Sequence, residues 1–385
     1  MLKIRFIRHF VLTLIVLSAG LIAACGGGGE NDMSTASMAS ARERHTATLL
    51  PSGNVLVSGG RGSSTLAELY DTSLGTWSSA GDTTETRFGH TAVVLPSGLL
   101  LVAGGDHVFY PVWGAPWGRP IKSAELFDPT TSTWSSTGNM THSHGVGHTG
   151  TLLQDGKVLI TGGDIEDVAG SATDRSIVAF SELYDPSTGT WSLTGDMTEP
   201  RKHHAATLLN DGSVLVVGGN SSEIYDPSLG TWSSAGNMPN NHGIGSTATA
   251  LKNGKILIVG GGERNLDGSP LAVSHVDIYD QSTGEWSSAS NMAAAELDHT
   301  ATLLGDGKLL IVGLISAQTY NPDTDTWTLA GDMSENRGST HAATTLENNT
   351  ILITGGSRVE RTRYGIEISR EVIASAEIYD PAKGW

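Results

Sequence analysis

The chain has 385 residues, with 49 glycines, 6% aromatic residues and 16% charged residues, a composition that excludes a largely helical protein and favours short strands joined by glycine turns. The net charge is −17, and it falls to −20 when the three basic residues of the first 24 positions (Lys3, Arg5 and Arg8) are removed. Because so acidic a surface repels phosphate backbones, we expect no nucleic-acid partner.

The first 24 residues have the pattern of a secretory signal. Residues 1–9 are basic, residues 10–24 are apolar, and small residues close the segment at Ala23-Ala24. The apolar run of 15 residues is shorter than the roughly 20 that a membrane span needs. We therefore predict a signal peptide over residues 1–24.

The segment Ile22-Ala23-Ala24-Cys25 resembles the lipobox of bacterial lipoproteins. The resemblance implies lipidation of Cys25, the only cysteine, and a location in the cell envelope with the chain on the periplasmic or extracellular side. Gly26 stands where an inner-membrane retention signal would have Asp, which favours the outer membrane or cell surface. The alternative is an ordinary signal peptide or an uncleaved anchor. Residues 25–32 form a flexible, glycine-rich tether.

From residue 33 to residue 385 the chain repeats one unit seven times. Tryptophans at spacings of 41 to 58 residues, typical of propeller blades, set the register: Trp77, Trp134, Trp191, Trp232, Trp286, Trp327 and Trp385. Each unit contains four apolar runs. In the third unit, for example, Asp155-Gly156 supplies a hairpin turn between the first two runs. Because four antiparallel strands cannot bury their own faces, the sequence predicts an all-β fold with seven radially packed blades.

A glycine pair after an apolar strand, followed by Tyr-Asp and then Trp, resembles the Kelch motif, and the resemblance covers residues 33–385. It implies a seven-bladed Kelch-type β-propeller in which the aromatic residues pack between blades and the glycines allow close backbone approach. The repeat residues other than the tryptophans are Gly59, Gly60, Tyr70, Gly104, Gly105, Gly162, Gly163, Tyr184, Gly218, Gly219, Tyr225, Gly260, Gly261, Tyr279, Tyr320, Gly355, Gly356 and Tyr379.

The repeats depart from the pattern at a few positions. Blade two has Phe127 for the tyrosine, and blade six has Gly313-Leu314 for the glycine pair. The last copy stops at its tryptophan, whereas Met38 aligns with the residues that follow a repeat tryptophan. We therefore predict that residues 33–38 supply or extend the outer strand of the last blade and close the ring, which removes free sheet edges.

Several polar residues recur in step with the blades. Histidines open most first strands, and some have an arginine three residues earlier, a common structural feature of the Kelch family: His45, His90, His148, His204, His299 and His341, with Arg42, Arg87 and Arg201. Acids recur on third strands, as at Glu68. A metal or anion site in the channel is one interpretation. Repetition favours a structural role instead, so we predict no metal, no cofactor and no catalytic residue.

The links between second and third strands do not repeat. They are long in four blades, and propeller topology places them on one face: residues 106–122, 164–179, 263–274 and 357–373. The blade-two link holds Phe109, Tyr110, Trp113 and Trp117 among prolines, a composition suited to stacking on sugar rings or anchoring a protein. The alternative is that this loop folds over its blade or plugs the channel mouth.

Two classes of function remain open. The one-sided insertions favour a monomeric binding or scaffolding module for protein or glycan, anchored to a membrane by lipid. The alternative is a carbohydrate-active enzyme, since some Kelch proteins resemble galactose oxidase or sialic-acid-type sugar epimerases. The galactose-oxidase resemblance implies a Cys–Tyr crosslink with copper, which cannot form inside the propeller because Cys25 is the only cysteine. The sequence therefore favours a binding protein over an enzyme.

Overall fold

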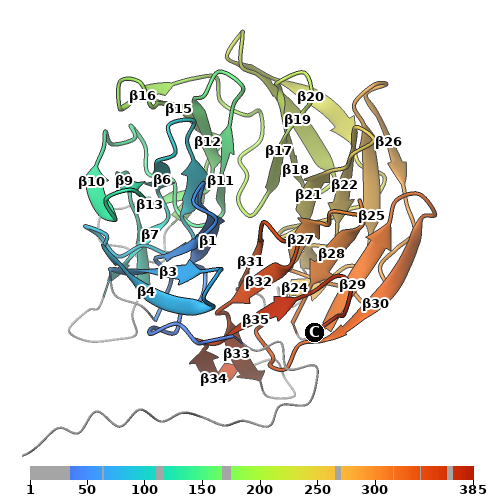
Figure 1. The fold of residues 1–385 in the computed structure, drawn as a ribbon. Coiled ribbons are helices and arrows are strands. Elements are labelled where there is room, and N and C mark those ends of the chain that lie inside the picture. Colours follow the sequence, from blue (N-terminus) through green and yellow to red (C-terminus); the bar gives the residue numbers. More distant parts are fainter. Residues whose placement is uncertain are drawn as a thin grey trace, which may run out of the picture. The chain divides into compact units, whose positions relative to one another are not determined.

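The computed structural model describes residues 35–62, 65–109, 117–166, 175–264, 270–314, 316–338, 340–361 and 367–385. These residues form seven antiparallel sheets arranged as blades around a central channel (Figure 1). The predicted all-β, seven-bladed propeller is confirmed. The described part of the chain contains no helix able to cross a membrane. The predicted signal peptide, Cys25 and the tether lie outside the described residues.

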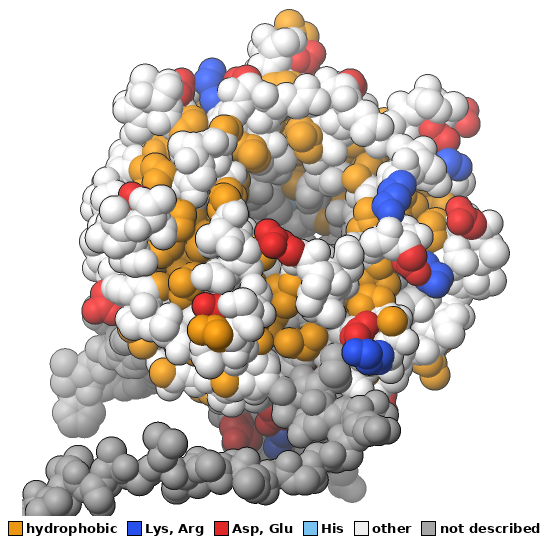
Figure 2. Space-filling view, in the orientation of Figure 1, with side chains coloured by type: hydrophobic (Ala, Val, Ile, Leu, Met, Phe, Trp, Pro, Cys, Tyr) orange, Lys and Arg blue, Asp and Glu red, His pale blue; other side chains and the backbone are white. Residues whose placement is uncertain are grey.

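The first strand of each blade lies beside the channel. Neighbouring first strands contact one another all the way round the ring, including the contact of the last blade with the first. The first strands are β1 (Thr46–Leu49), β5 (Thr91–Val94), β11 (His148–Leu152), β17 (Ala205–Leu208), β21 (Thr247–Ala250), β27 (Thr300–Leu303) and β31 (Ala342–Thr345). The space-filling view shows the resulting hollow at the centre of the ring (Figure 2).

The second strand of each blade is almost completely buried because it has a neighbouring strand on each side and a neighbouring blade on each face. This explains its uninterrupted apolar sequence. The second strands are β2 (Val55–Ser58), β6 (Leu100–Ala103), β12 (Val158–Gly162), β18 (Val214–Gly218), β22 (Lys255–Val259), β28 (Leu309–Val312) and β32 (Ile351–Thr354).

The third and fourth strands carry the repeated aromatic pair, such as Tyr70 and Trp77, whose ring centroids lie 4.9 Å apart. The third strands are β3 (Leu66–Asp71), β9 (Ala124–Asp128), β15 (Ser181–Asp185), β19 (Ser221–Asp226), β25 (Val276–Asp280), β29 (Ser316–Asn321) and β35 (Ala376–Tyr379). The fourth strands are β4 (Thr76–Asp82), β10 (Thr133–Ser136), β16 (Thr190–Leu193), β20 (Thr231–Asn237), β26 (Glu285–Ser288) and β30 (Thr326–Asp332).

The core consists of seven apolar clusters, each lying between two neighbouring blades. The repeat glycines allow neighbouring blades to pack closely against each other. A Cβ on Gly59, whose φ is +60°, would lie 2.4 Å from the carbonyl oxygen of Arg87 in the next blade. The glycine pair is therefore required where one blade meets the next.

Both ends of the chain contribute to the outer edge of the last blade. Met38 N donates to the carbonyl oxygen of Ala374 at 2.9 Å, beside β35. Trp77 of the first blade donates from Nε1 to the Ala36 carbonyl oxygen at 2.6 Å, as other repeat tryptophans do to the preceding blade. These contacts confirm the predicted closure for residues 35–38. The two residues before them lie outside the described part.

Candidate binding site at the channel mouth

The predicted long links are β-hairpins rather than irregular loops. They are β7 (Asp106–Phe109) with β8 (Trp117–Pro120), β13 (Asp164–Glu166) with β14 (Arg175–Ile177), β23 (Gly262–Arg264) with β24 (Pro270–Ala272), and β33 (Ser357–Arg361) with β34 (Glu367–Val372). Backbone bridges join two hairpins to segments that precede first strands, as between Phe88 and Asp106. Single backbone hydrogen bonds join the other two, from Gly145 N to the Asp164 carbonyl oxygen and from Ser357 N to the Arg337 carbonyl oxygen. The hairpins therefore lie at the end of the channel where the first strands begin, and we call this end the channel mouth.

Ion pairs fix the hairpins of blades two and three to each other. Arg175 contacts Asp106 at 2.8 Å and Asp164 at 3.0 Å, and it donates to the Gly118 carbonyl oxygen at 2.5 Å. Both carboxylates are nearly buried, and burial raises the pKa of Asp106 although the Arg175 guanidinium opposes the shift. One buried cluster of charges therefore joins the two hairpins.

The aromatic residues predicted for ligand binding are described only in part. Phe109 and Trp117 pair across the hairpin of β7 and β8, and their side chains lie outside the described part. Tyr110 and Trp113 lie outside the described residues altogether. Their role in binding stays a prediction.

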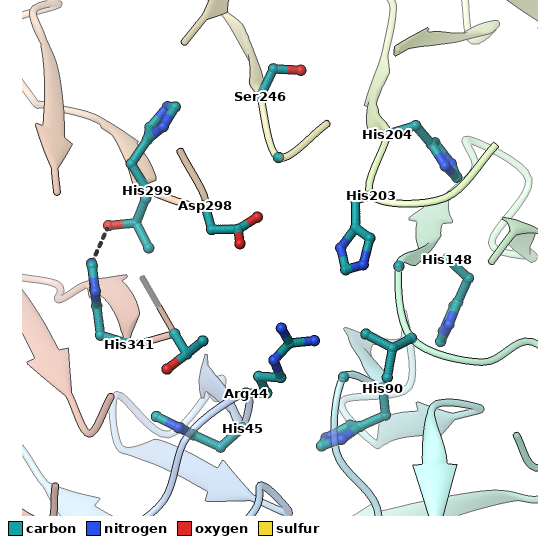
Figure 3. A pocket seen from close by; sticks show the side chains of 16 residues that line it. Arg44, His45, His90, His148, His203, His204, Ser246, Asp298, His299 and His341 are labelled. Atoms are coloured by element: carbon teal, nitrogen blue, oxygen red, sulfur yellow. Dashed lines mark hydrogen bonds between the residues drawn. The ribbon is translucent and has the colours of Figure 1, made fainter. Parts of the chain in front are cut away.

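A cavity of about 320 Å³ lies in the channel and is lined by residues from all seven blades. Its inward-facing side chains come from the position just before each first-strand histidine or its equivalent. Arg44, His203 and Asp298 point towards the centre, whereas the strand-opening histidines lie farther out (Figure 3). The corresponding positions in the other blades are Gly89, Gly147, Gly245 and Thr340.

The strand-opening histidines bind the neighbouring blade. His90 Nε2 lies 2.9 Å from Thr46 Oγ1, and His204 Nε2 lies 2.9 Å from Thr149 Oγ1. Burial lowers the pKa of His204 to about 3, so the ring is neutral at physiological pH. These contacts support the structural interpretation of the repeated histidines.

The recurring arginines and third-strand acids form buried ion pairs. Arg42 contacts Glu68 at 2.6 Å, and Glu68 also accepts hydrogen bonds from the backbone N–H groups of Ala39 and Ser40. The same pairing occurs in three further blades: Arg87 with Glu125, Arg201 with Glu223, and Arg337 with Glu377. The pattern of an arginine three residues before the strand-opening histidine did not identify Arg337, because Arg337 precedes His341 by four residues. The acids are therefore structural.

Blade six departs from this pairing. Glu296 occupies the place of the arginine, and the neutral Gln318 occupies the place of the acid. Burial raises the pKa of Glu296 to about 7. A Cβ on Gly313 would lie 2.2 Å from the Glu296 carboxylate, so this glycine makes room for the acid.

The channel residues do not fit a copper centre. Of the described inward-facing side chains, only His203 and Asp298 could supply metal ligands, and five of the six strand-opening histidines bind threonines. Within the described ranges, no group of three or more His, Cys, Asp or Glu side chains is placed to hold an ion. A copper site usually needs more converging donors than these two.

The inward-facing residues were missed at the sequence level. The signal was nevertheless present, because the position before the strand-opening residue reads Arg, Gly, Gly, His, Gly, Asp and Thr around the ring. A position that varies in charge within an otherwise regular repeat is not explained by the repeat itself.

Seven blades around a channel define a β-propeller: six are four-stranded sheets, and the last is a three-stranded sheet whose outer edge is covered by residues 35–38. Its glycine pairs and Tyr–Trp pairs resemble the Kelch motif. The family model for the Kelch motif matches residues 86–141 and 246–293. The matched segments lie in blades two and five, so two of the seven blades carry a sequence that matches the Kelch motif.

Three known proteins are similar to the chain in sequence or in fold. The chain is 32% identical over 120 residues to the Kelch-like protein terF of Aspergillus terreus, an alignment that covers 28% of this chain and only about a quarter (26%) of that relative. A fungal alcohol oxidase of the AA5 family in complex with copper has a TM-score of 0.69 at 18% identity, over 91% of this chain and 77% of its own. The structure of YjhT has a TM-score of 0.56 at 15% identity, over 77% of this chain and 99% of its own. At these identities the structural likeness shows the fold alone.

Proposed function

We propose that the protein is a binding or scaffolding module of the cell envelope, which holds a protein or glycan partner on the face around the channel mouth. The observation that carries this proposal is the placement of all four non-repeating hairpins at one end of the channel. Insertions on one face of a rigid scaffold are the usual location of binding residues, because the scaffold tolerates change there without loss of its core.

Two features support this face as a binding surface. The hairpins of blades two and three are held by Arg175, and Arg370 on β34 contacts Glu43 beside the first blade at 2.6 Å. A surface fixed in this way loses little conformational freedom when a partner binds. The hairpin of β7 and β8 also leads into the aromatic segment around Trp113, which supplies the residue types enriched at binding hot spots.

The test is a binding screen of the full chain against a glycan array and against envelope extracts, with bound proteins identified by mass spectrometry. The variant is the double substitution Trp113→Ala with Trp117→Ala. The matched control is Leu74→Ala with Leu229→Ala, since both leucines are 72% exposed in turns at the opposite end of the blades. A specific ligand that is lost in the tryptophan variant and kept by the control is expected. A ligand that is lost equally in both variants would contradict the proposal.

The same proposal places the protein on a membrane through lipid on Cys25. Metabolic labelling with a fatty-acid analogue should label the wild type and leave Cys25→Ser unlabelled, because acyl transfer needs the thiol. The variant should then leave the membrane fraction, since the anchor is removed. Equal labelling of both proteins would refute the lipid anchor.

A carbohydrate-active enzyme of the epimerase or oxidase kind is the second candidate. It is favoured by the likeness to the alcohol oxidase and by two groups, His203 and Asp298, that face the cavity and could transfer protons. Turnover of simple sugars by the purified full chain, lost in His203→Gln, would establish this alternative in place of the binding module.

A further inference from the structure

Three inward-facing side chains of the channel stand on strained backbone. Arg44, His203 and Asp298 have φ values of +54°, +52° and +50°. Three other blades place glycine at the equivalent position, as at Gly89 and Gly245, where φ is +60° and +70°. A left-handed conformation costs an ordinary residue roughly 1–2 kcal/mol. Strained residues that could be glycine are characteristic of functional sites.

Among the described residues, the charges at two of these positions have no ion-pair partner. Arg44 and Asp298 form no ion pair with each other or with any other described residue, although buried pairs are formed close by, as between Arg42 and Glu68. Both side chains are half-buried in the channel, where an unpaired charge is less well solvated than on the outer surface. As far as the described residues go, the cavity therefore offers a ligand one unpaired cation and one unpaired anion.

The backbone holds these side chains in place. The segments before the first strands are joined from blade to blade by hydrogen bonds of 2.8–3.1 Å, from Arg44 N to Thr340 O, Gly89 N to Arg44 O, His203 N to Gly147 O, Gly245 N to His203 O and Asp298 N to Gly245 O. The glycines also create space, because a Cβ on Gly245 would lie 2.3 Å from the Asp298 carboxylate. The geometry is thus set before any ligand arrives.

We propose that this cavity binds a small zwitterion of the free amino-acid class, with its carboxylate on Arg44 and its ammonium group on Asp298. Such a ligand satisfies both charges at once through charge-assisted hydrogen bonds. A simple anion or a simple cation would satisfy one charge and leave the other unpaired. The volume of about 320 Å³ lies at the lower end of the range for small-molecule sites and suits a ligand of this size.

His203 completes the site as a neutral polar group. Burial lowers its pKa, Asp298 opposes this shift and Arg44 adds to it, so the imidazole is uncharged at neutral pH. It can therefore donate or accept one hydrogen bond without disturbing the balance of one cation and one anion. No described hairpin residue lines this cavity, so amino-acid binding and partner binding can be tested separately.

The experiment uses the full chain purified in detergent. Each of the protein amino acids is added at about 10 mM in a thermal-shift screen, and the strongest is then titrated calorimetrically beside its two single-charge analogues, for example propionate and ethylamine for L-alanine. At least one amino acid should bind, and each analogue should bind at least tenfold more weakly. If no amino acid shifts the melting temperature, or if an analogue binds as well as the amino acid, the proposal is wrong.

Charge-neutral variants locate the site. Arg44→Gln and Asp298→Asn should each weaken binding at least tenfold while the melting temperature stays near that of the wild type. The matched controls Arg358→Gln and Asp323→Asn remove the same charges from positions outside the cavity and should leave the affinity unchanged. Unchanged affinity in both cavity variants would overturn the assignment, whatever the outcome of the partner screen.

Discussion

Arg42 and Arg44 lie two residues apart, but only Arg42 contributes to the packing of the blades. The Arg42 side chain is fully buried, pairs with Glu68, and has counterparts in three other blades. Arg44 is half-exposed, forms no ion pair with a described residue, and is held at a positive φ where three other blades have glycine. The comparison teaches that a residue repeated around the ring contributes to blade packing, whereas a residue that breaks the repeat on strained backbone is not explained by packing.

The strand-opening histidines extend the comparison, because each immediately follows an inward-facing position. His45 and Arg44 are neighbours, yet His45 binds Thr354 of the last blade at 2.8 Å while Arg44 points into the cavity. Successive residues at the start of a strand face different surroundings. In this channel, a residue that faces the cavity is thus followed directly by a residue that binds the neighbouring blade.

The largest expected effect is loss of the fold in acid through the repeated histidines. Burial lowers the pKa of His45, His204 and His299 to about 3, and that of His148 and His341 to about 4, all below the ordinary 6.5. Their stabilising effect is complete above pH 6.5 and is lost as the pH falls towards these values. At pH 5 each of these buried histidines lowers the free energy of unfolding by about 2 kcal/mol. The five together lower it by an amount comparable to a typical net stability of about 5–15 kcal/mol.

Circular dichroism melts between pH 7.5 and 5 test this expectation. The control is Glu296→Gln, because the raised pKa of Glu296 makes its contribution grow as the pH falls below about 7, opposite in sign to the histidines. The variant should therefore lose stability in acid more steeply than the wild type. A melting temperature independent of pH across this range would mean that the histidines take up protons without unfolding.

A smaller but still large effect is expected from breaking one repeated ion pair. Arg42→Met leaves the Glu68 carboxylate buried without its guanidinium partner and should reduce the free energy of unfolding by about 3–5 kcal/mol. Adding Glu68→Gln should recover part of this loss, because Gln318 in blade six already occupies the equivalent place and accepts hydrogen bonds from Ala293 N and Ala294 N.

Chemical denaturation measures both variants beside a surface control. Arg358→Met removes an arginine whose side chain is 42% exposed, and it should change stability by less than about 1 kcal/mol. An Arg42→Met protein as stable as this control would show that the buried pair contributes nothing net, and repetition would then no longer identify structural residues.

The fold could be predicted from the sequence because its determinants are local and recur seven times. The glycine pairs, the Tyr–Trp pairs and the apolar second strands each have one physical role, and each copy confirms the others. Even the closure of the ring followed from the alignment of Met38 with later repeats, and Met38 packs in the cluster between the last and first blades. Phe127 and Gly313-Leu314 did not disturb the prediction, because blade packing tolerates single departures.

The candidate site could be predicted only in part. The face with the insertions followed from topology, but the hairpin structure and the joining of Asp106 to Asp164 through Arg175 depend on contacts between blades. The inward-facing residues were hidden for another reason. His203 stands beside His204 in sequence, and only the three-dimensional arrangement shows that one faces the cavity and the other faces Thr149.

The smallest expected effect is a gain in stability at a position that breaks the repeat. Arg44→Gly should raise the free energy of unfolding by about 0.5–1 kcal/mol, because relief of the left-handed backbone exceeds the entropy that glycine adds to the unfolded chain. The matched control is Ser132→Gly, an exposed turn residue with the same φ of +54°. Chemical denaturation should show a similar gain for both variants.

The two glycine variants should differ only in ligand binding. Arg44→Gly removes the guanidinium from the cavity and should abolish amino-acid binding, whereas Ser132→Gly leaves the cavity intact. A variant that gains stability and loses a ligand identifies a residue retained at a cost to the fold. If Arg44→Gly instead destabilised the protein by more than about 1 kcal/mol, Arg44 would belong with Arg42 among the residues that hold the blades together, and the contrast between the two would fail.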